Sequence, residues 1–277
     1  FTKYDVKSCE YNVTNLICWN QFYQYEWTFL NDRLIIVDKE NNRMLMPAGK
    51  KIGAKGLHHL TRYLKKSDFY GKIELVDDEY LSENSDIKEF FSVSEEQDYS
   101  EYLYSVKKLR ELKGTKLHKK KNLVAQFTKL YPNYRVETVT QINLAEIGKF
   151  ANRVLQKNSQ VSRSIREEHG AIKTALELFE TLNLEGLIIK VNEEFVAFSL
   201  FSRLNSTTYD IHFEKSDFTY KGSAQVINYE TALALQDKCQ FVNREQDLGI
   251  PGLRQAKMSY DPLKIQKYYT LVPLDMD

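Results

Sequence analysis

The order of predicted elements in the second half of the chain constrains the fold most. Three runs rich in β-branched and aromatic residues are joined by short polar turns, as in an antiparallel meander: 186–191, 195–203 and 207–213. A turn at Lys221 and Gly222 follows, then an apolar-periodic stretch at 223–236 that predicts a helix, and a short strand at 240–242. This order places the free backbone N–H groups of a helix N-terminus beside a strand edge, which suits an anionic ligand.

The first half of the chain repeats this order loosely. Its predicted elements are a helix at 12–23, strands at 25–30, 33–38 and 43–47, a glycine-rich connection at 49–56, a helix at 57–65 and a strand at 72–76. Further helices are predicted at 106–113, 116–130, 143–156 and 167–182, with a strand at 135–139. No residue-level repeat is visible, so the duplication rests on element order alone. We expect an α/β (α+β) chain of two domains, 1–131 and 132–277, each with a mixed, mostly antiparallel sheet flanked by helices.

The net charge of +1 conceals two opposed blocks. From Glu74 to Glu101 there are eleven acids and one base, and from Val106 to Lys121 there are eight bases and one acid. One interpretation is a solvated acidic face and a solvated basic helix that partly neutralise each other. The other is that the basic block binds phosphate groups.

Cysteine usage and hydropathy favour a cytoplasmic protein. Cys9, Cys18 and Cys239 are odd in number and include no CxxC pair, so neither a disulfide framework nor a zinc site is expected, and no metal site is predicted. No apolar run approaches the ~20 residues that cross a bilayer. The first residues lack the basic-then-apolar layout of a secretion signal.

The order of helices, meander, glycine turn, helix and strand resembles the GNAT acyltransferase fold. In that fold the turn holds the pyrophosphate of coenzyme A with the pattern Arg/Gln-x-x-Gly-x-Gly/Ala. Gly222 and Ala224 match this pattern, whereas Thr219 stands where Arg or Gln belongs. The departure argues against acetyl-CoA, yet an anion site is still expected at Gly222, with Lys215 or Lys221 supplying positive charge.

Four longer segments carry a more specific resemblance. They are YLYSVKKLRELKGTKLHKKKN at 102–122, EGLIIKVNEEFVAFSL at 185–200, HFEKSDFTYKG at 212–222 and FVNREQDLGIPGLRQAKMSY at 241–260. Together with CEYNVTNLICW near the start, they resemble the family of proteins similar to the C-terminal domain of phosphatidylglycerol lysyltransferase, over nearly the whole chain. The resemblance implies two tandem GNAT-like acyltransferase domains and a relationship to the Fem-type peptidoglycan aminoacyltransferases.

The same resemblance implies transfer of an acyl or aminoacyl group to an amine or hydroxyl acceptor. No cofactor is certain, and aminoacyl-tRNA or acyl-CoA is the expected donor co-substrate. The membrane-spanning half of the lipid-modifying relatives is not seen here, which weakens the expectation of a lipid acceptor and leaves peripheral membrane contact open. Two alternatives remain: a non-catalytic GNAT-fold module that binds RNA or another anionic ligand, and an acetyl-CoA-dependent N-acetyltransferase.

Candidate binding residues lie in two charged segments. The basic segment offers mobile point charges for phosphates, although a solvated helix face is the alternative: His118, Lys119, Lys120 and Lys121. After the strand at 240–242, Arg244 offers a fork for a carboxylate, and Glu245 and Asp247 offer acids for an α-ammonium group. An internal salt-bridge network that holds the strand end is an equally compatible interpretation.

Candidate catalytic residues lie in and after the third strand of the meander. His212 and Glu214 are expected on one strand face, where a general base lies beside a binding carboxylate, and Asp247 joins them as a candidate. A hydrogen-bonded structural histidine is the alternative for His212. Lys257 and Tyr260 are expected to reach the same cleft, unless they are a surface lysine and a packed tyrosine. We expect this site between the two halves, weighted towards the second.

Overall fold

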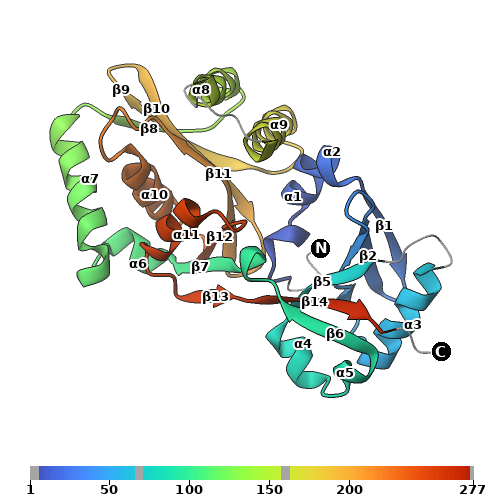
Figure 1. Cartoon of the computed structure of the whole chain (residues 1–277). Coiled ribbons are helices and arrows are strands. Elements are labelled where there is room, and N and C mark those ends of the chain that lie inside the picture. Colours follow the sequence, from blue (N-terminus) through green and yellow to red (C-terminus); the bar gives the residue numbers. More distant parts are fainter. Residues whose placement is uncertain (1–5, 66–70, 157–162, 275–277) are drawn as a thin grey trace.

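The chain forms two sheets that lie side by side, each with its own helices (Figure 1). The computed structural model describes residues 6–65, 71–156 and 163–274. The expected fold class, an α/β chain with two mixed sheets flanked by helices, is confirmed. We call the part built on the first sheet the first lobe and the part built on the second sheet the second lobe.

The first sheet has the strand order β1-β2-β3-β5-β14-β6, with β4 paired to β2. Its strands are β1 (Tyr25–Leu30), β2 (Arg33–Asp38), β3 (Arg43–Leu45), β4 (Ala48–Gly49), β5 (Lys72–Asp77), β6 (Phe91–Glu95) and β14 (Tyr268–Pro273). Strands β1 to β3 form an antiparallel meander, whereas β3 and β5 are parallel. A parallel pair needs a crossover connection, which helix α3 (Ala54–Lys65) supplies here. This half therefore has the predicted order of meander, glycine-rich loop, helix and strand.

The second sheet has the strand order β13-β7-β12-β11-β10-β9-β8. Its strands are β7 (Glu101–Ser105), β8 (Arg135–Thr138), β9 (Glu185–Val191), β10 (Glu194–Arg203), β11 (Thr208–Ser216), β12 (Phe241–Gln246) and β13 (Lys264–Gln266). Strands β11 and β12 are parallel and are joined through helix α10 (Ser223–Ala234). The predicted meander and crossover of the second half are confirmed.

Helices cover both faces of the second sheet (Figure 1). One face packs on α6 (Val106–Glu111), α7 (His118–Leu130) and α10, and the other on α1 (Val13–Cys18), α8 (Leu144–Gln156) and α9 (Arg163–Glu177). The remaining helical segments are η1 (Cys9–Tyr11), α2 (Asn20–Tyr23), α4 (Asp78–Glu83), α5 (Ile87–Phe90), η2 (Gln97–Tyr99), η3 (Thr115–Leu117) and α11 (Pro251–Met258). Because α1 contacts α9, the N-terminal segment reaches from the first lobe onto the second.

Each sheet takes a strand from the other half of the sequence. Strand β7, which precedes residue 131, lies in the second sheet, and β14, near the end of the chain, lies in the first. The domain boundary expected between residues 131 and 132 stays a prediction, but it does not separate the strands of the two sheets. The chain therefore passes between the two sheets before β7 and again after β13, in addition to the N-terminal segment that packs on the second lobe ahead of β1.

A β-bulge in β11 decides which side chains share a face. Leu200 pairs with Phe213 and the next residue of β10, Phe201, pairs with Ile211, so His212 is an extra residue with no partner opposite it. Ile211 consequently packs in the core with α10, whereas Phe213 packs in the core with α8 and α9. In a regular strand these two side chains would lie on the same face.

Candidate functional site

Two polar clusters flank strands β11 and β12 on opposite faces of the second sheet. The tyrosine cluster comprises Tyr104, Lys120, Glu214, Arg244 and Tyr260. The buried acid cluster comprises Cys9, Glu101, Asp210, His212 and Glu245. Arg244 and Glu245 are neighbours on β12 and point into different clusters, because successive side chains of a strand alternate between its faces. The bulge does the same for His212 and Glu214, so the prediction that these two share a face is wrong.

The tyrosine cluster joins the lysine-rich helix α7 to residues 243–245 of β12, which we call the Asn-Arg-Glu segment. Lys120 Nζ lies 4.3 Å from the centre of the Tyr260 ring, and the Arg244 guanidinium carbon lies 5.0 Å from the same centre. Arg244 also lies 5.8 Å from the centre of the Tyr104 ring. Burial and the Arg244 charge both lower the pKa of Lys120. Two cations thus lie over one buried ring, and their summed positive charge raises the local affinity for an anion.

Glu214 is the acid of the tyrosine cluster. Its Oε1 accepts a hydrogen bond from Arg244 Nη2 at 2.9 Å, whereas its Oε2 is buried and has no hydrogen-bond partner in the described part of the chain. A carboxylate oxygen of this kind is able to accept a proton or to bind an ammonium group. Of the three predicted catalytic residues in the described part of the chain, Glu214 is the one that lies among predicted binding residues and has a carboxylate oxygen without a hydrogen-bond partner.

The other residues of the basic segment lie on the surface beside this cluster. His118, Lys119 and Lys121 are exposed on the first turn of α7. Lys120 is half-buried, because its side chain turns inward onto Tyr260. The basic segment is therefore a solvated helix face with one inward lysine, and it contacts the predicted ligand-binding residues rather than lying apart from them.

Lys257 fixes two members of the tyrosine cluster, Arg244 and Tyr104, by hydrogen bonds. Its Nζ donates hydrogen bonds to the backbone oxygens of Arg244 and Gln246, at 2.6 Å for Gln246. Burial lowers the pKa of Lys257 to about 8. Its backbone oxygen accepts a hydrogen bond from the Tyr104 hydroxyl at 2.8 Å. Lys257 thus holds the irregular end of β12 and Tyr104 in place. Its two Nζ hydrogen bonds both go to backbone oxygens of this chain.

Asp247 belongs to a separate ion-pair network. Arg254 donates to both of its carboxylate oxygens, at 2.7 and 2.8 Å, and the Gly249 N–H donates at 2.9 Å. The Tyr102 hydroxyl donates to the same carboxylate. Although burial opposes it, this set of donors lowers the pKa of Asp247. Both oxygens are engaged within the chain by Arg254, not by the neighbouring Arg244 of the expected network, and Asp247 lies outside the tyrosine cluster.

The glycine turn before α10 is covered by α7. Gly222 has φ of +91°, and a Cβ added there would lie 2.6 Å from the backbone oxygen of Leu123. Within the turn, the Asp217 carboxylate accepts hydrogen bonds from the backbone N–H and the hydroxyl of Thr219. Lys221 is exposed, and Lys215 pairs with Glu168 at 2.6 Å. The α7 backbone therefore lies directly against Gly222, on the side to which an added Cβ would point.

We expect Gly222→Ala to lower the free energy of unfolding by about 1–3 kcal/mol, because alanine is strained at this φ and meets the α7 backbone. Gly252→Ala is the matched control, since an added Cβ there meets nothing within 4 Å. Urea denaturation measures both variants. Equal midpoints for the two would contradict the close contact between α7 and the turn.

The buried acid cluster lies between η1, α1 and the second sheet. His212 Nδ1 lies 3.1 Å from Asn15 Oδ1 and 3.3 Å from Glu245 Oε1, and its Nε2 lies 2.9 Å from the Ser202 hydroxyl. This pattern places the proton on Nδ1, with Nε2 accepting from Ser202. Both ring nitrogens are occupied and the side chain is buried, so His212 matches the structural alternative.

Glu101 anchors the N-terminal segment to the second sheet. Its carboxylate accepts hydrogen bonds from the Ser8 hydroxyl at 2.6 Å, from the Cys9 N–H at 3.1 Å and from Asn243. Burial raises the pKa of Glu101 to about 7, although these donors oppose the shift. The folded state therefore binds a proton at this group more tightly than the unfolded chain does.

This raised pKa predicts a pH dependence of stability. The contribution of Glu101 is fully present below its unfolded pKa near 4.5, and it is lost as the pH rises through about 7. The shift corresponds to about 3 kcal/mol at 1.36 kcal/mol per pKa unit. Glu101→Gln should therefore flatten the fall in unfolding free energy between pH 4.5 and 7, whereas Glu177→Gln on exposed α9 should not. An unchanged slope in Glu101→Gln would contradict the assignment.

A cavity of about 600 Å³ is lined by the N-terminal segment on either side of Cys9, the loop that precedes α3, helix α4 and Tyr268. No member of the tyrosine cluster lines it, whereas Ser8, which donates a hydrogen bond to Glu101 of the buried acid cluster, does. Among the described residues, no helix combines the length and apolar character needed to cross a bilayer. Every member of the tyrosine cluster lies in the second lobe, but the cluster joins both halves of the sequence: Tyr104 and Lys120 come from the first half, and Glu214, Arg244 and Tyr260 from the second. The expected position of the site between the two halves stays a prediction.

Comparison with known proteins supports the family inferred from the sequence. The model of the family described as "Phosphatidylglycerol lysyltransferase, C-terminal" matches residues 1–271. A crystal structure of a conserved protein of unknown function from Bacteroides thetaiotaomicron is 30% identical, with a TM-score of 0.92, and the match covers 99% of this chain and 94% of that one. An uncharacterised protein of Mycoplasmoides gallisepticum is 24% identical over 61% of this chain and 54% of its own length. The match thus spans about half the length of this curated relative.

More distant structures share the fold. The C-terminal domain of a putative lysylphosphatidylglycerol synthetase from Agrobacterium fabrum has a TM-score of 0.62 at 11% identity, covering 92% of this chain and 86% of that one. FemX has a TM-score of 0.65 at 9% identity, covering 99% and 94%. At these identities the likeness concerns the fold alone.

Sequence inspection missed Cys9, Glu101 and Asp210 as members of one cluster. No sequence motif surrounds any of the three residues. The cluster forms only when η1 packs between β7 and β11. Tyr104 was missed as well, because a tyrosine in a strand is an ordinary core residue. No local pattern distinguishes these positions, since their contacts join residues 92 or more positions apart.

Proposed function

The chain belongs to the phosphatidylglycerol lysyltransferase C-terminal family, and from that premise we propose that it transfers an aminoacyl group from aminoacyl-tRNA to an amine or hydroxyl acceptor. Family and fold together make it an aminoacyl-transferase-like domain of GNAT type. The donor, the acceptor and the roles of single residues are the parts that we propose. The tyrosine cluster is the proposed site.

The observation that carries the proposal is the meeting of α7 and β12 on Tyr260. Exposed Lys119 and Lys121 continue this positive surface along the first turn of α7. Lysines at this spacing neutralise the phosphates of a nucleic acid strand. Beside them, half-buried Lys120 and Arg244 are placed to meet a negative charge that develops in a drier environment. The surface therefore suits a polyanionic donor whose reactive end enters at Tyr260.

The residues present match the needs of ester aminolysis or transesterification. The acceptor amine or hydroxyl attacks the ester carbonyl of the donor, a C–N or C–O bond forms, and the bond to the tRNA ribose oxygen breaks. We assign the acceptor proton to Glu214 Oε2, which returns it to the leaving ribose oxygen. Arg244 and Lys120 stabilise the negative charge on the carbonyl oxygen.

The closed glycine turn favours this donor over coenzyme A. In the proposed scheme the pyrophosphate position at Gly222 is filled by the α7 backbone, while the positive charge lies on the outer side of the same helix. Thr219 also lacks the cation that the coenzyme A pattern requires. We therefore expect acetyl-CoA to give no saturable binding by isothermal calorimetry, under conditions in which charged tRNA binds.

A further inference from the structure

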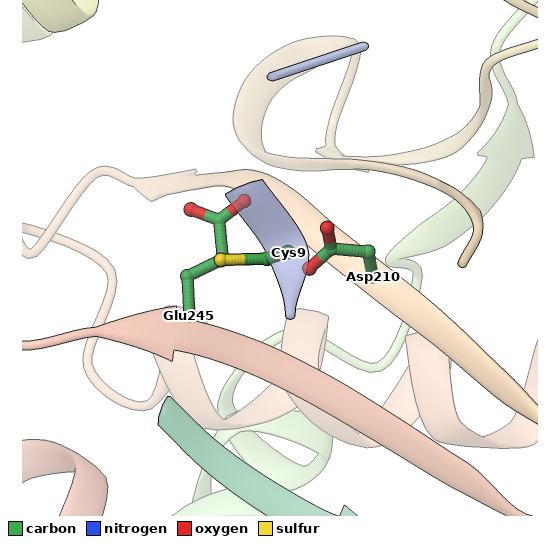
Figure 2. A group of neighbouring side chains, drawn as sticks. All are labelled: Cys9, Asp210 and Glu245. Carbon is green, nitrogen blue, oxygen red and sulfur yellow. The ribbon is translucent and has the colours of Figure 1, made fainter. Parts of the chain in front are cut away.

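The buried acid cluster holds three metal-ligating groups from three distant parts of the chain. One ligand atom from each of Cys9, Asp210 and Glu245 lies within 4.8 Å of the other two. Figure 2 shows the three side chains converging, with Cys9 between the two carboxylates. A thiol and two carboxylates are ligands of zinc and related divalent transition metals.

The backbone holds each of these residues in place. Cys9 is fixed because its N–H donates to Glu101, and Asp210 lies in the paired part of β11 opposite Ser202 and Asn243. Glu245 has φ of +57°, a conformation that few non-glycine residues adopt. It is the one ligand of the three that is partly exposed, and it lies on the irregular stretch of β12.

Asp210 gives an independent sign that something is bound here. The residue is fully buried, and its Oδ1 has no hydrogen-bond partner among the described residues. Its Oδ2 receives one long hydrogen bond, from Asn12 Nδ2 at 3.4 Å. A buried carboxylate without donors is costly unless it is protonated or binds a cation.

The surroundings add negative charge rather than remove it. Glu101 and Glu10 lie near the same three groups, and both raise the pKa of the Cys9 thiol after the larger effect of burial. The cationic Lys257 Nζ is directed at two backbone oxygens instead. Gln246 Nε2 donates to Glu10 Oε1 at 2.9 Å and lies 3.6 Å from Cys9 Sγ.

We propose that Cys9, Asp210 and Glu245 bind one divalent transition-metal ion of the zinc class, which ties the N-terminal segment to the second sheet. The proposal is independent of the proposed function, because the tyrosine cluster lies on the other face of β11 and β12. Zinc bonds of about 2.0–2.3 Å require the three ligand atoms to draw closer than 4.8 Å. We assign this movement to the Glu245 side chain, which is the partly exposed one of the three, while the His212 Nδ1–H orients its carboxylate as hydrogen-bond donors do around metal sites. The metal displaces the protons of the Cys9 thiol and the Asp210 carboxyl, so its affinity rises with pH.

Cobalt titration tests this site directly. The full chain, freed of any affinity tag and metal and kept reduced by a phosphine, is titrated with Co²⁺ and read by absorption. We expect one equivalent to give a thiolate-to-cobalt charge-transfer band in the near ultraviolet. Cys9→Ser should lose the band, whereas Cys18→Ser, equally buried but outside the cluster, should keep it. The absence of a band, or its persistence in Cys9→Ser, overturns the proposal.

Thermal unfolding gives a second measurement that does not depend on removing the thiol. Zn²⁺ should raise the Tm of the wild type by several degrees, and Mg²⁺, which prefers oxygen ligands, should not. Asp210→Asn keeps the side-chain shape and should abolish the Zn²⁺ shift, because it removes one of the three ligands. An equal Zn²⁺ shift in wild type and Asp210→Asn contradicts metal binding at this cluster.

Discussion

Glu214→Gln is expected to reduce the turnover of aminoacyl transfer by about 10²- to 10⁴-fold, the usual contribution of a positioned acid–base group. The amide keeps the size of the side chain and a hydrogen-bond acceptor for Arg244, but it cannot take the acceptor's proton. Binding of the donor should change little, because the lysines of α7 are untouched.

Single-turnover transfer from charged tRNA, with donor binding measured in parallel, separates these two effects. Glu185→Gln is the matched control, since Glu185 also pairs with a cation, Lys238, but lies away from the tyrosine cluster. A Glu214→Gln protein that transfers at the wild-type rate would remove Glu214 from the chemistry.

The combined Lys119→Ala, Lys120→Ala and Lys121→Ala variant should show the second large effect, on binding of the donor. Its turnover should also fall, because the proposed role of Lys120 is to stabilise the carbonyl oxygen. In the proposed scheme Lys119 and Lys121 each meet a phosphate, and two phosphate contacts on a single strand contribute about 1.4 to the slope of log affinity against log salt concentration. The variant should therefore bind tRNA more weakly at low salt and show a slope smaller by about that amount. Fluorescence anisotropy across a salt series measures both quantities.

The control variant removes three positive charges from parts of the surface outside α7. Lys39, Lys149 and Lys173 are exposed lysines on other elements, and their joint replacement by alanine should leave the slope unchanged. If both triple variants behave alike, tRNA responds to overall charge and the basic segment is no specific binding surface.

The sequence was sufficient for elements that local pattern determines. The strands at 25–30 and 33–38 were predicted with the observed bounds, because both are rich in strand-forming residues and flank Asn31 and Asp32, which have positive φ. The helix predicted at 12–23 is divided into α1 and α2 at Trp19. Periodicity alone does not reveal such a break.

Strand pairing between distant parts of the chain could not be predicted from the sequence. Strand β14 returns to the first sheet between β5 and β6, although it follows residues that belong to the second. The sequence does not specify which sheet a late strand joins, because that choice depends on burial against both neighbours. Strand β6 and helix α11 were also missed.

The candidate site was predicted in part. Lys120, Arg244, Glu214 and Tyr260 come together as candidates from separate segments, because the family resemblance pointed to both the basic and the Asn-Arg-Glu segments. His212 was misplaced, since a one-residue bulge moves every later side chain to the other face and leaves no mark in the sequence. The docking of Cys9 beside Asp210 joins residues about 200 positions apart, which no local signal reports.

The most direct test of the central claim is a transfer assay with a mixture of radiolabelled aminoacyl-tRNAs and a crude acceptor extract. The account predicts protein-dependent movement of label from tRNA into an acceptor, which the α7 triple-lysine variant slows and Glu214→Gln nearly abolishes. Label that stays on tRNA with the wild-type protein, while acetyl-CoA is consumed in a parallel reaction, would contradict it.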